Sequence, residues 1–186
     1  KQNAANLRTK GWELMLTWND AFKLANKPFR YNLSVGLADN TSEITKFDNP
    51  SKILSDYYVG QKLGDIWGYV VDGLFRTDEE AANYNVDQTA VNFVINTAQV
   101  NPGLHAGDMK FVDLDGDHTI SSGSNTADDP GDRKIIGNSL PRYTYSIQGG
   151  FDWYGFDFSI YLQGVGHQDW YPGTNSVFFW GPYARP

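Results

Sequence analysis

The sequence predicts an all-β protein built from antiparallel strands, and three observations point to that class. Four segments alternate apolar and polar residues with the period of two that a strand produces. The polar faces carry mostly uncharged residues, whereas a soluble sandwich strand tends to carry Lys, Glu and Thr there. Aromatic residues form 15% of the chain and stand at the ends of the apolar faces. This arrangement favours transmembrane β-barrel strands, with aromatic girdles bracketing a lipid-facing band, over a soluble β-sandwich.

The first expected hairpin lies within residues 1–37, with strands at 12–18 and 30–37. Its connection, residues 20–28, contains the turn-forming residues Asp20, Asn26 and Pro28. The expected apolar face consists of Trp12, Leu14, Leu16, Trp18, Tyr31, Leu33, Val35 and Leu37. A two-stranded antiparallel pair is the simplest arrangement of these segments.

The second expected hairpin covers residues 143–163, with strands at 143–151 and 154–163 around the tight turn "DWYG". The expected apolar face consists of Tyr143, Tyr145, Ile147, Phe151, Phe156, Phe158, Ile160 and Leu162. Four strands cannot close a barrel, so they predict a partial barrel.

The segment 38–142 between the hairpins predicts one large structured loop, because it has neither repeats nor low-complexity runs. Within it, Thr77 and Glu80 have the spacing of a capping box, which predicts a short helix. Residues 164–186 are expected to begin another loop.

Composition excludes several classes of protein. The formal net charge of -7 and the pI of about 4.8 argue against nucleic-acid binding, which relies on clustered Lys and Arg. The chain has no cysteine, so it has no disulfides and no thiol nucleophile. No apolar run approaches the roughly 18 residues of a membrane-spanning helix. The sequence has neither HExxH nor GxSxG, and we expect it not to be an enzyme.

The stretch "DLDGDHTIS" resembles a calcium loop. Such a loop takes oxygen ligands at positions 1, 3 and 5, a backbone carbonyl at position 7, and a carboxylate at position 12. Asp113, Asp115 and Asp117 fit the first three positions, and the Thr119 carbonyl fits the fourth. Calcium, or a similar hard cation, is therefore the candidate ligand, and its role would be to order the loop.

Two departures weaken this site. Position 6, normally glycine, is His118, and position 12 is Ser124. The missing carboxylate has three candidate replacements, Asp128, Asp129 and Asp132, and Asp108 is a further candidate ligand from upstream. The alternative is an Asp-Gly turn with solvated carboxylates held by local hydrogen bonds.

Aromatic residues in the expected loops are candidates for contact with a ligand or partner, or for ordinary packing. We place the expected contact near the end of the chain, at Trp170, Tyr171, Phe178, Phe179 and Trp180. Trp67 and Tyr69 are expected to be structural.

Four motifs together resemble the late barrel region of the SusC/RagA family of TonB-dependent outer-membrane transporters of Bacteroidota. They are, in order, "NLRTKGWELMLTW", "VGQKLGDIWGYVVDGLFRTDEE", "HAGDMKFVDLDGDHTIS" and "GDRKIIGNSLPRYTYSIQGGFDWYGFDFSIYLQGVGHQDW", and the match covers residues 6–175. The resemblance implies strands from the C-terminal part of a barrel wall, with segment 38–142 as an extracellular loop. It implies a location in the Gram-negative outer membrane, in contact with lipid.

The resemblance further implies import of oligosaccharides or peptides with a SusD-like lipoprotein as partner. TonB would act through parts of the protein outside these 186 residues. The residues expected to line the lumen are Glu13, Thr17, Asn32, Ser146, Gln148, Asp157 and Gln163. Two rival readings remain open from the residues: a soluble, secreted β-sandwich that binds carbohydrate and has a calcium-stabilised loop, and a segment of an extracellular hydrolase.

Overall fold

The computed structural model describes residues 5–91 and 103–171. Its largest element, here called the wall sheet, has four antiparallel strands in the order β1-β2-β7-β8. These strands are β1 (Asn6–Leu24), β2 (Lys27–Lys46), β7 (Arg142–Trp153) and β8 (Phe156–His167). The predicted all-β class and the pairing into two hairpins are confirmed.

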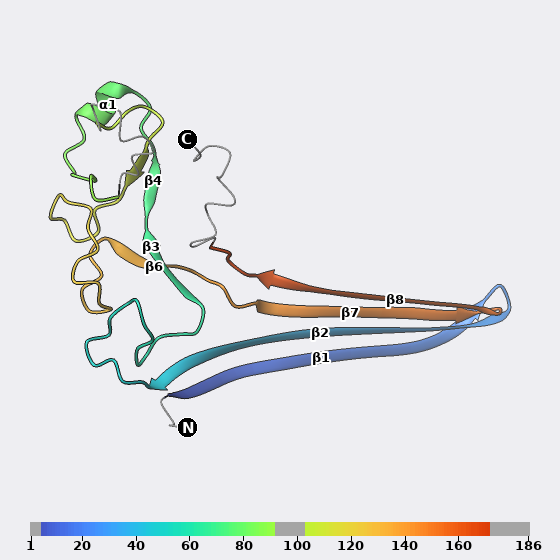
Figure 1. The fold of residues 1–186 in the computed structure, drawn as a ribbon. Helices are drawn as coiled ribbons and strands as arrows, with labels where there is room; N and C mark the ends of the chain where they lie inside the picture. Colours follow the sequence, from blue (N-terminus) through green and yellow to red (C-terminus); the bar gives the residue numbers. More distant parts are fainter. Residues whose placement is uncertain (1–4, 92–102, 172–186) are drawn as a thin grey trace, which may run out of the picture.

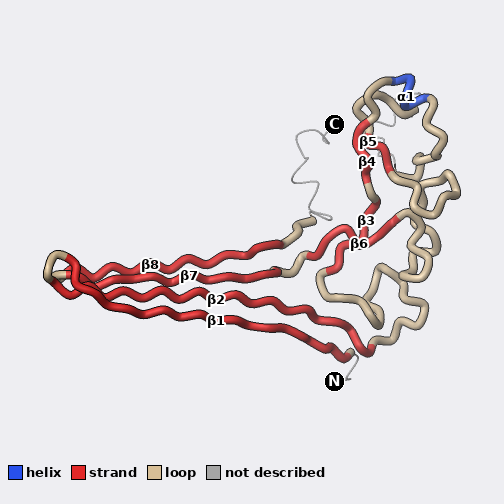
Figure 2. The backbone as a smooth tube through the Cα atoms, turned by 180° about the vertical axis from the view of Figure 1, so that it is seen from behind, coloured by secondary structure: helices blue, strands red, loops and turns tan. Residues whose placement is uncertain are grey.

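The described chain between β2 and β7, residues 47–91 and 103–141, is here called the loop unit. It gathers at one end of the wall sheet, opposite the two hairpin turns (Figures 1 and 2). Two small ribbons form it, together with the helix α1 (Asp78–Ala82). The ribbons pair β3 (Asp65–Tyr69) with β6 (Arg133–Asn138) and β4 (Val71–Leu74) with β5 (Met109–Phe111).

The strand register places the expected apolar residues on one face of the wall sheet. One row across all four strands joins Leu16, Val35, Ile147 and Leu162. Because side chains alternate between faces, the rows two residues away lie on this same face. Leu16 is 61% exposed, so nothing in the described residues covers this face at its centre.

The neighbouring rows make the opposite face polar. Thr17, Ser34, Gln148 and Tyr161 form one such row, and the hydroxyls of Thr17 and Ser34 are 3.0 Å apart. Two open hollows border this face, of about 760 Å³ and 660 Å³. The polar face is therefore the hollowed one, as the inner face of a barrel wall is.

Aromatic rings form a band across the sheet near the hairpin turns. The ring centroids of Phe29 and Phe151 lie 5.4 Å apart, and those of Phe151 and Phe158 also lie 5.4 Å apart. Phe22 lies 4.9 Å from Phe29 on the other side. The band therefore links all four strands through ring contacts, which add to the ladder hydrogen bonds.

The first hairpin turn is shorter than expected, and the second, Tyr154 and Gly155, lies within the expected "DWYG". The expected connection 20–28 is wrong in extent, because strand pairing continues to Leu24 and resumes at Lys27. Only Ala25 and Asn26 form the turn, both at positive φ, as two-residue hairpin turns require. Pro28 fits within β2 because the β2–β7 pairing begins only at Phe29, so its missing N–H removes no bond to β7.

The wall strands also extend further than expected at the loop-unit end. β2 continues past residue 37 to Lys46, and β8 continues past residue 163 to His167. The three boundaries between the expected segments 1–37, 38–142, 143–163 and 164–186 thus all fall inside strands, namely β2, β7 and β8.

The capping box predicts the position of α1. The Thr77 side chain is the N-cap and accepts a hydrogen bond from the Glu80 N–H. The Glu80 carboxylate reaches one residue further back than expected and accepts from the Arg76 N–H at 2.9 Å. Three acidic residues in the first turn also suit the positive end of the helix dipole.

Candidate functional site

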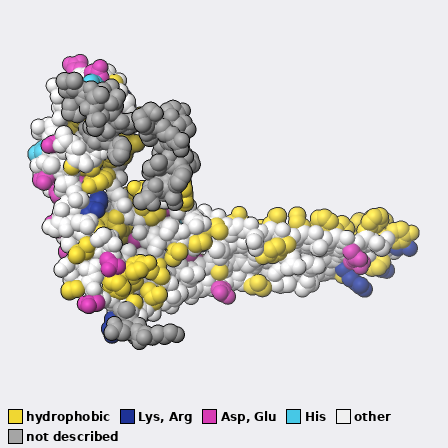
Figure 3. All heavy atoms as spheres, viewed as in Figure 1, with side chains coloured by type: hydrophobic (Ala, Val, Ile, Leu, Met, Phe, Trp, Pro, Cys, Tyr) yellow, Lys and Arg dark blue, Asp and Glu magenta, His cyan; other side chains and the backbone are white. Residues whose placement is uncertain are grey.

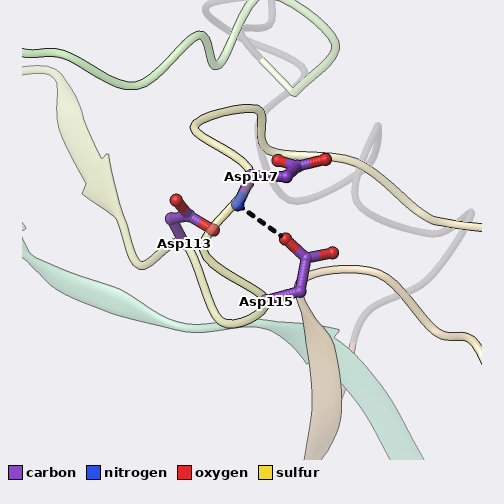
Figure 4. A group of neighbouring side chains, drawn as sticks. All are labelled: Asp113, Asp115 and Asp117. Atoms are coloured by element: carbon purple, nitrogen blue, oxygen red, sulfur yellow. Dashed lines mark hydrogen bonds between the residues drawn. The ribbon is translucent and has the colours of Figure 1, made fainter.

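The three predicted aspartates converge in the loop unit. One carboxylate oxygen from each of Asp113, Asp115 and Asp117 can be chosen so that all three lie within 4.8 Å of one another. Figure 4 shows the three side chains around one turn of chain. Each also accepts a backbone hydrogen bond, including one to Asp115 from the Asp117 N–H at 3.2 Å. The sequence spacing therefore brings together the side chains that it predicts.

The turn forms although glycine is missing at position 6. His118 has φ 65°, the left-handed conformation that glycine adopts readily there. Its N–H donates to Asp113 at 2.9 Å, and the Gly116 N–H donates to the other Asp113 oxygen at 2.7 Å. Histidine is among the non-glycine residues that are enriched in this region, so the turn forms with His118 in place of glycine.

The electrostatics of the first two aspartates differ. Partial burial raises the pKa of Asp113, but the N–H groups of Gly116 and His118 outweigh it, and the pKa lies below the ordinary 3.8. For Asp115 the Asp117 N–H lowers the pKa, while burial and the carboxylates of Asp117, Asp132 and Asp113 raise it above 3.8. Mutual repulsion of the carboxylates is thus present, and a bound cation would relieve it.

None of the four further aspartates expected as candidate ligands joins the cluster. Asp128 forms an ion pair with Lys52 at 2.8 Å, and Asp108 accepts from the His105 N–H at 2.8 Å. Asp129 accepts from both the N–H and the hydroxyl of Ser124, which hold its pKa below 3.8. Among the described residues, the carboxylates that converge at the candidate cation site are therefore those of Asp113, Asp115 and Asp117.

Asp132, the remaining candidate, holds the backbone of the aspartate loop through hydrogen bonds. It is fully buried, and its carboxylate accepts from the Leu114 and Ser121 N–H groups, both at 2.7 Å. Ile120 is also fully buried, and its N–H donates to the Asp87 carbonyl at 2.7 Å. These contacts hold both ends of the loop, and sequence reasoning assigned no such role to Asp132.

Asp115→Asn is expected to stabilise the calcium-free loop unit at pH 7, because the amide keeps the Asp117 contact and removes a repelled charge. The raised pKa means that the unsubstituted loop gains stability as pH falls through that pKa toward 3.8. The variant should lack this gain. Native-state hydrogen exchange of residues 116–120, in the presence of a chelator, measures both effects.

Asp113→Asn is the matched control, and it should destabilise the same loop. Asn has only one acceptor oxygen, whereas Asp113 accepts on both. Its lowered pKa means that its stabilising effect is lost as pH falls through the folded-state pKa below 3.8. Faster exchange in Asp115→Asn at pH 7 would contradict the assigned repulsion.

The predicted contact aromatics fall into two groups. Trp170 and Tyr171 follow β8 and are 70% and 65% exposed. Phe178, Phe179 and Trp180 lie outside the described residues. Tyr69, expected to be structural, packs edge-on against Phe111 at 6.0 Å within the loop unit, and Trp67 lies half-buried in β3.

Charge is distributed unevenly between the two parts of the chain. The loop unit contains 15 acidic and 6 basic residues, so its net charge is -9, against -7 for the whole chain. Figure 3 shows acidic side chains spread over the loop unit, whereas basic and acidic ones lie together at the hairpin tip. The loop unit thus carries the negative potential that attracts cations.

The fold and the site together define a class: a segment of antiparallel β-barrel wall with an acidic, structured loop unit at one rim. In keeping with that class, the chain is similar to two TonB-dependent receptors of Formosa agariphila. It is 27% identical to TonB-dependent receptor P39 over 183 residues, which cover 86% of this chain and 17% of that protein. It is 22% identical to TonB-dependent receptor P3 over 175 residues, which cover 87% of this chain and 15% of that protein.

These comparisons make the chain a distant relative of TonB-dependent receptors, which are outer-membrane proteins and not enzymes. The chain spans less than a fifth of the length of either relative. No family model matches it. In the part of the chain that the structure describes, no helix is long and apolar enough to cross a bilayer.

Proposed function

We propose that this chain is part of the wall of a SusC-type TonB-dependent transporter that imports oligosaccharides or peptides across the outer membrane. The observation that carries the proposal is the wall sheet, whose rows are apolar on one face and polar on the other across all four strands. The similarity to two TonB-dependent receptors supports it independently. The four motifs of the SusC/RagA resemblance favour that branch.

In this proposal the apolar face meets lipid, the polar face lines the lumen, and the loop unit is extracellular. Short turns face the periplasm in outer-membrane barrels and long loops face outward, which supports this orientation. A SusD-like lipoprotein is the proposed partner on the outer side. The proposed contacts with that partner or with cargo include Trp170 and Tyr171, which are 70% and 65% exposed.

The rival reading, a soluble β-sandwich, needs a second sheet packed on the apolar face. Within residues 5–91 and 103–171 no such sheet covers it, since the two smaller ribbons belong to the loop unit. Sandwich sheets pack about 10 Å apart with interdigitating side chains. The exposed Leu16 and Leu162, at 61% and 50%, favour the barrel wall.

The test is deletion of the gene for the full-length protein in its own bacterium. Growth on defined oligosaccharides and peptides as sole carbon source should fail for one cargo class and return on complementation. A strain with inactive TonB should show the same defect. The proposal would be contradicted if the deletion strain grew unchanged on every substrate of both classes and the parent strain had no such protein in its outer-membrane fraction.

We also propose that Asp113, Asp115, Asp117 and the Thr119 carbonyl bind calcium, with water completing the six to eight oxygens that calcium prefers. The convergence of three carboxylates and the left-handed His118 favour this assignment. The absence of a position-12 carboxylate predicts weak binding, on the order of 10⁻⁴ to 10⁻³ M, as in extracellular modules.

Calorimetric titration of the chelator-treated full-length protein with calcium should give heat that Asp115→Ala removes or weakens about tenfold. Asp128→Ala is the matched control, because Asp128 pairs with Lys52 outside the cluster. It should leave the titration unchanged. No heat at millimolar calcium would remove the calcium proposal without affecting the transporter proposal.

A further inference from the structure

The loop unit is fastened to the wall sheet where the chain leaves it. Beyond the last β2–β7 pair, at Ala38, residues 60–63 take over as the neighbour of β2. The Ile44 N–H donates to the Gln61 carbonyl, and the Ile44 carbonyl accepts from the Gly60 N–H, both at 2.9 Å. The Leu63 N–H donates to the Ser42 carbonyl at 2.9 Å. These bonds continue the sheet ladder into the loop unit, and Ile44 is buried beneath them.

A second attachment centres on Asn138, at the end of β6. Its side-chain amide donates to the Leu63 carbonyl and to the Asp65 carboxylate, both at 3.0 Å. The adjoining Ser139 N–H donates to the Gly64 carbonyl at 2.8 Å. Asn138 therefore binds β6 to the segment that already pairs with β2.

Asp169, which follows β8, links Asn138 to the end of that strand. The Asn138 N–H donates to its carboxylate at 2.8 Å, and the Asp169 N–H donates back to the Asn138 carbonyl at 3.0 Å. The His167 ring nitrogen Nε2 lies 3.0 Å from the same carboxylate. The Asn138 N–H and the His167 ring together hold the pKa of Asp169 below 3.8. A Cβ on Gly137 would lie 2.6 Å from that carboxylate, so the packing leaves no space for a side chain there.

Where the chain re-enters the wall, an ion pair ties the wall strands β2 and β7 to each other. The Arg142 guanidinium donates to both carboxylate oxygens of Asp39, at 2.6 and 2.5 Å. The Asp39 side chain is only 8% exposed, which strengthens a bidentate pair of this kind. The loop unit is therefore attached at β2 and at Asp169 after β8, on either side of β7, so rotation about one attachment breaks the other.

We propose that these contacts form a rim lock, which makes the loop unit a fixed part of the wall and prevents it from swinging as a lid. The lock is a property of the chain's geometry; its consequence for uptake rests on the proposed transporter function. In uptake, any opening and closing must then occur in parts of the protein other than this loop unit.

Spin labels at Lys10→Cys in the wall and Asp72→Cys in the loop unit test the lock in the full-length protein, in lipid vesicles. Both side chains are exposed, and this chain has no other cysteine. Double electron–electron resonance should give one narrow distance distribution. Asn138→Asp should broaden it, because the variant loses both amide donors and places a carboxylate beside Asp65.

A broad or two-peaked distribution in the unsubstituted protein would overturn the lock. An unchanged narrow distribution in Asn138→Asp would overturn the role of Asn138 as its hub. Hydrogen exchange adds a check that does not depend on substitution: the amides of Ile44, Gly60 and Leu63 should exchange as slowly as those of central β2. Because no cargo is needed, failure here is distinguishable from failure of the growth test.

Discussion

Leu16→Arg is expected to remove about 2–4 kcal/mol from the stability of the full-length protein in a bilayer, the cost of arginine on a lipid-facing strand near the membrane midplane. Leu16 belongs to the central apolar row and is 61% exposed. The row lies between the aromatic band near the hairpin turns and Trp12 toward the rim. Urea unfolding in phospholipid vesicles measures the loss, and the amount of protein in the outer membrane should fall with it.

Thr17→Arg is the matched control, since it introduces the same side chain one residue along β1 on the opposite face. The polar row there includes Ser34, Gln148 and Tyr161, so a guanidinium can stay hydrated or hydrogen-bonded. Its cost should be clearly smaller than that of Leu16→Arg. Equal losses from the two substitutions would mean that the two faces meet similar surroundings, and the barrel-wall assignment would fail.

The strand faces could be predicted from the sequence because a period of two depends only on local side-chain alternation. Leu16 and Val35 occupy the expected face, and the register then follows from the two-residue turn. Strand ends could not be predicted in the same way. Asp20 and Pro28 are turn-forming residues, but ladder pairing on both sides of Ala25 and Asn26 outweighs their local preference.

For the candidate cation site too, the local features could be predicted from the sequence and the long-range ones could not. The spacing of Asp113, Asp115 and Asp117 places them around one turn, and that much is local. The absence of a fourth carboxylate depends on long-range contacts, such as Lys52 with Asp128, that no local pattern encodes. Asn138 gives a faint signal in "GNS", typical of a turn, but its partners at Leu63 and Asp169 are far away in sequence.

Asp132→Ala is expected to destabilise the loop unit by about 3 kcal/mol. The substitution removes two hydrogen bonds to a carboxylate and leaves the Leu114 and Ser121 N–H groups without their acceptor. Asp132 is fully buried, so water cannot readily replace it. The free energy of local opening, measured by native-state hydrogen exchange at Leu114, Ile120 and Ser121, should fall by this amount.

Asp128→Ala separates the loss of buried hydrogen bonds from the loss of a negative charge. Asp128 lies four residues away, and its side chain is 71% exposed in an ion pair with Lys52. Exposed pairs of this kind contribute about 0.2–1 kcal/mol, so exchange in this variant should stay close to that of the unsubstituted protein. If the two variants instead open with the same free energy, then charge, and not the carboxylate's two backbone contacts, governs the loop. In that case the hydrogen bonds of Asp132 would not be what holds the cation site rigid.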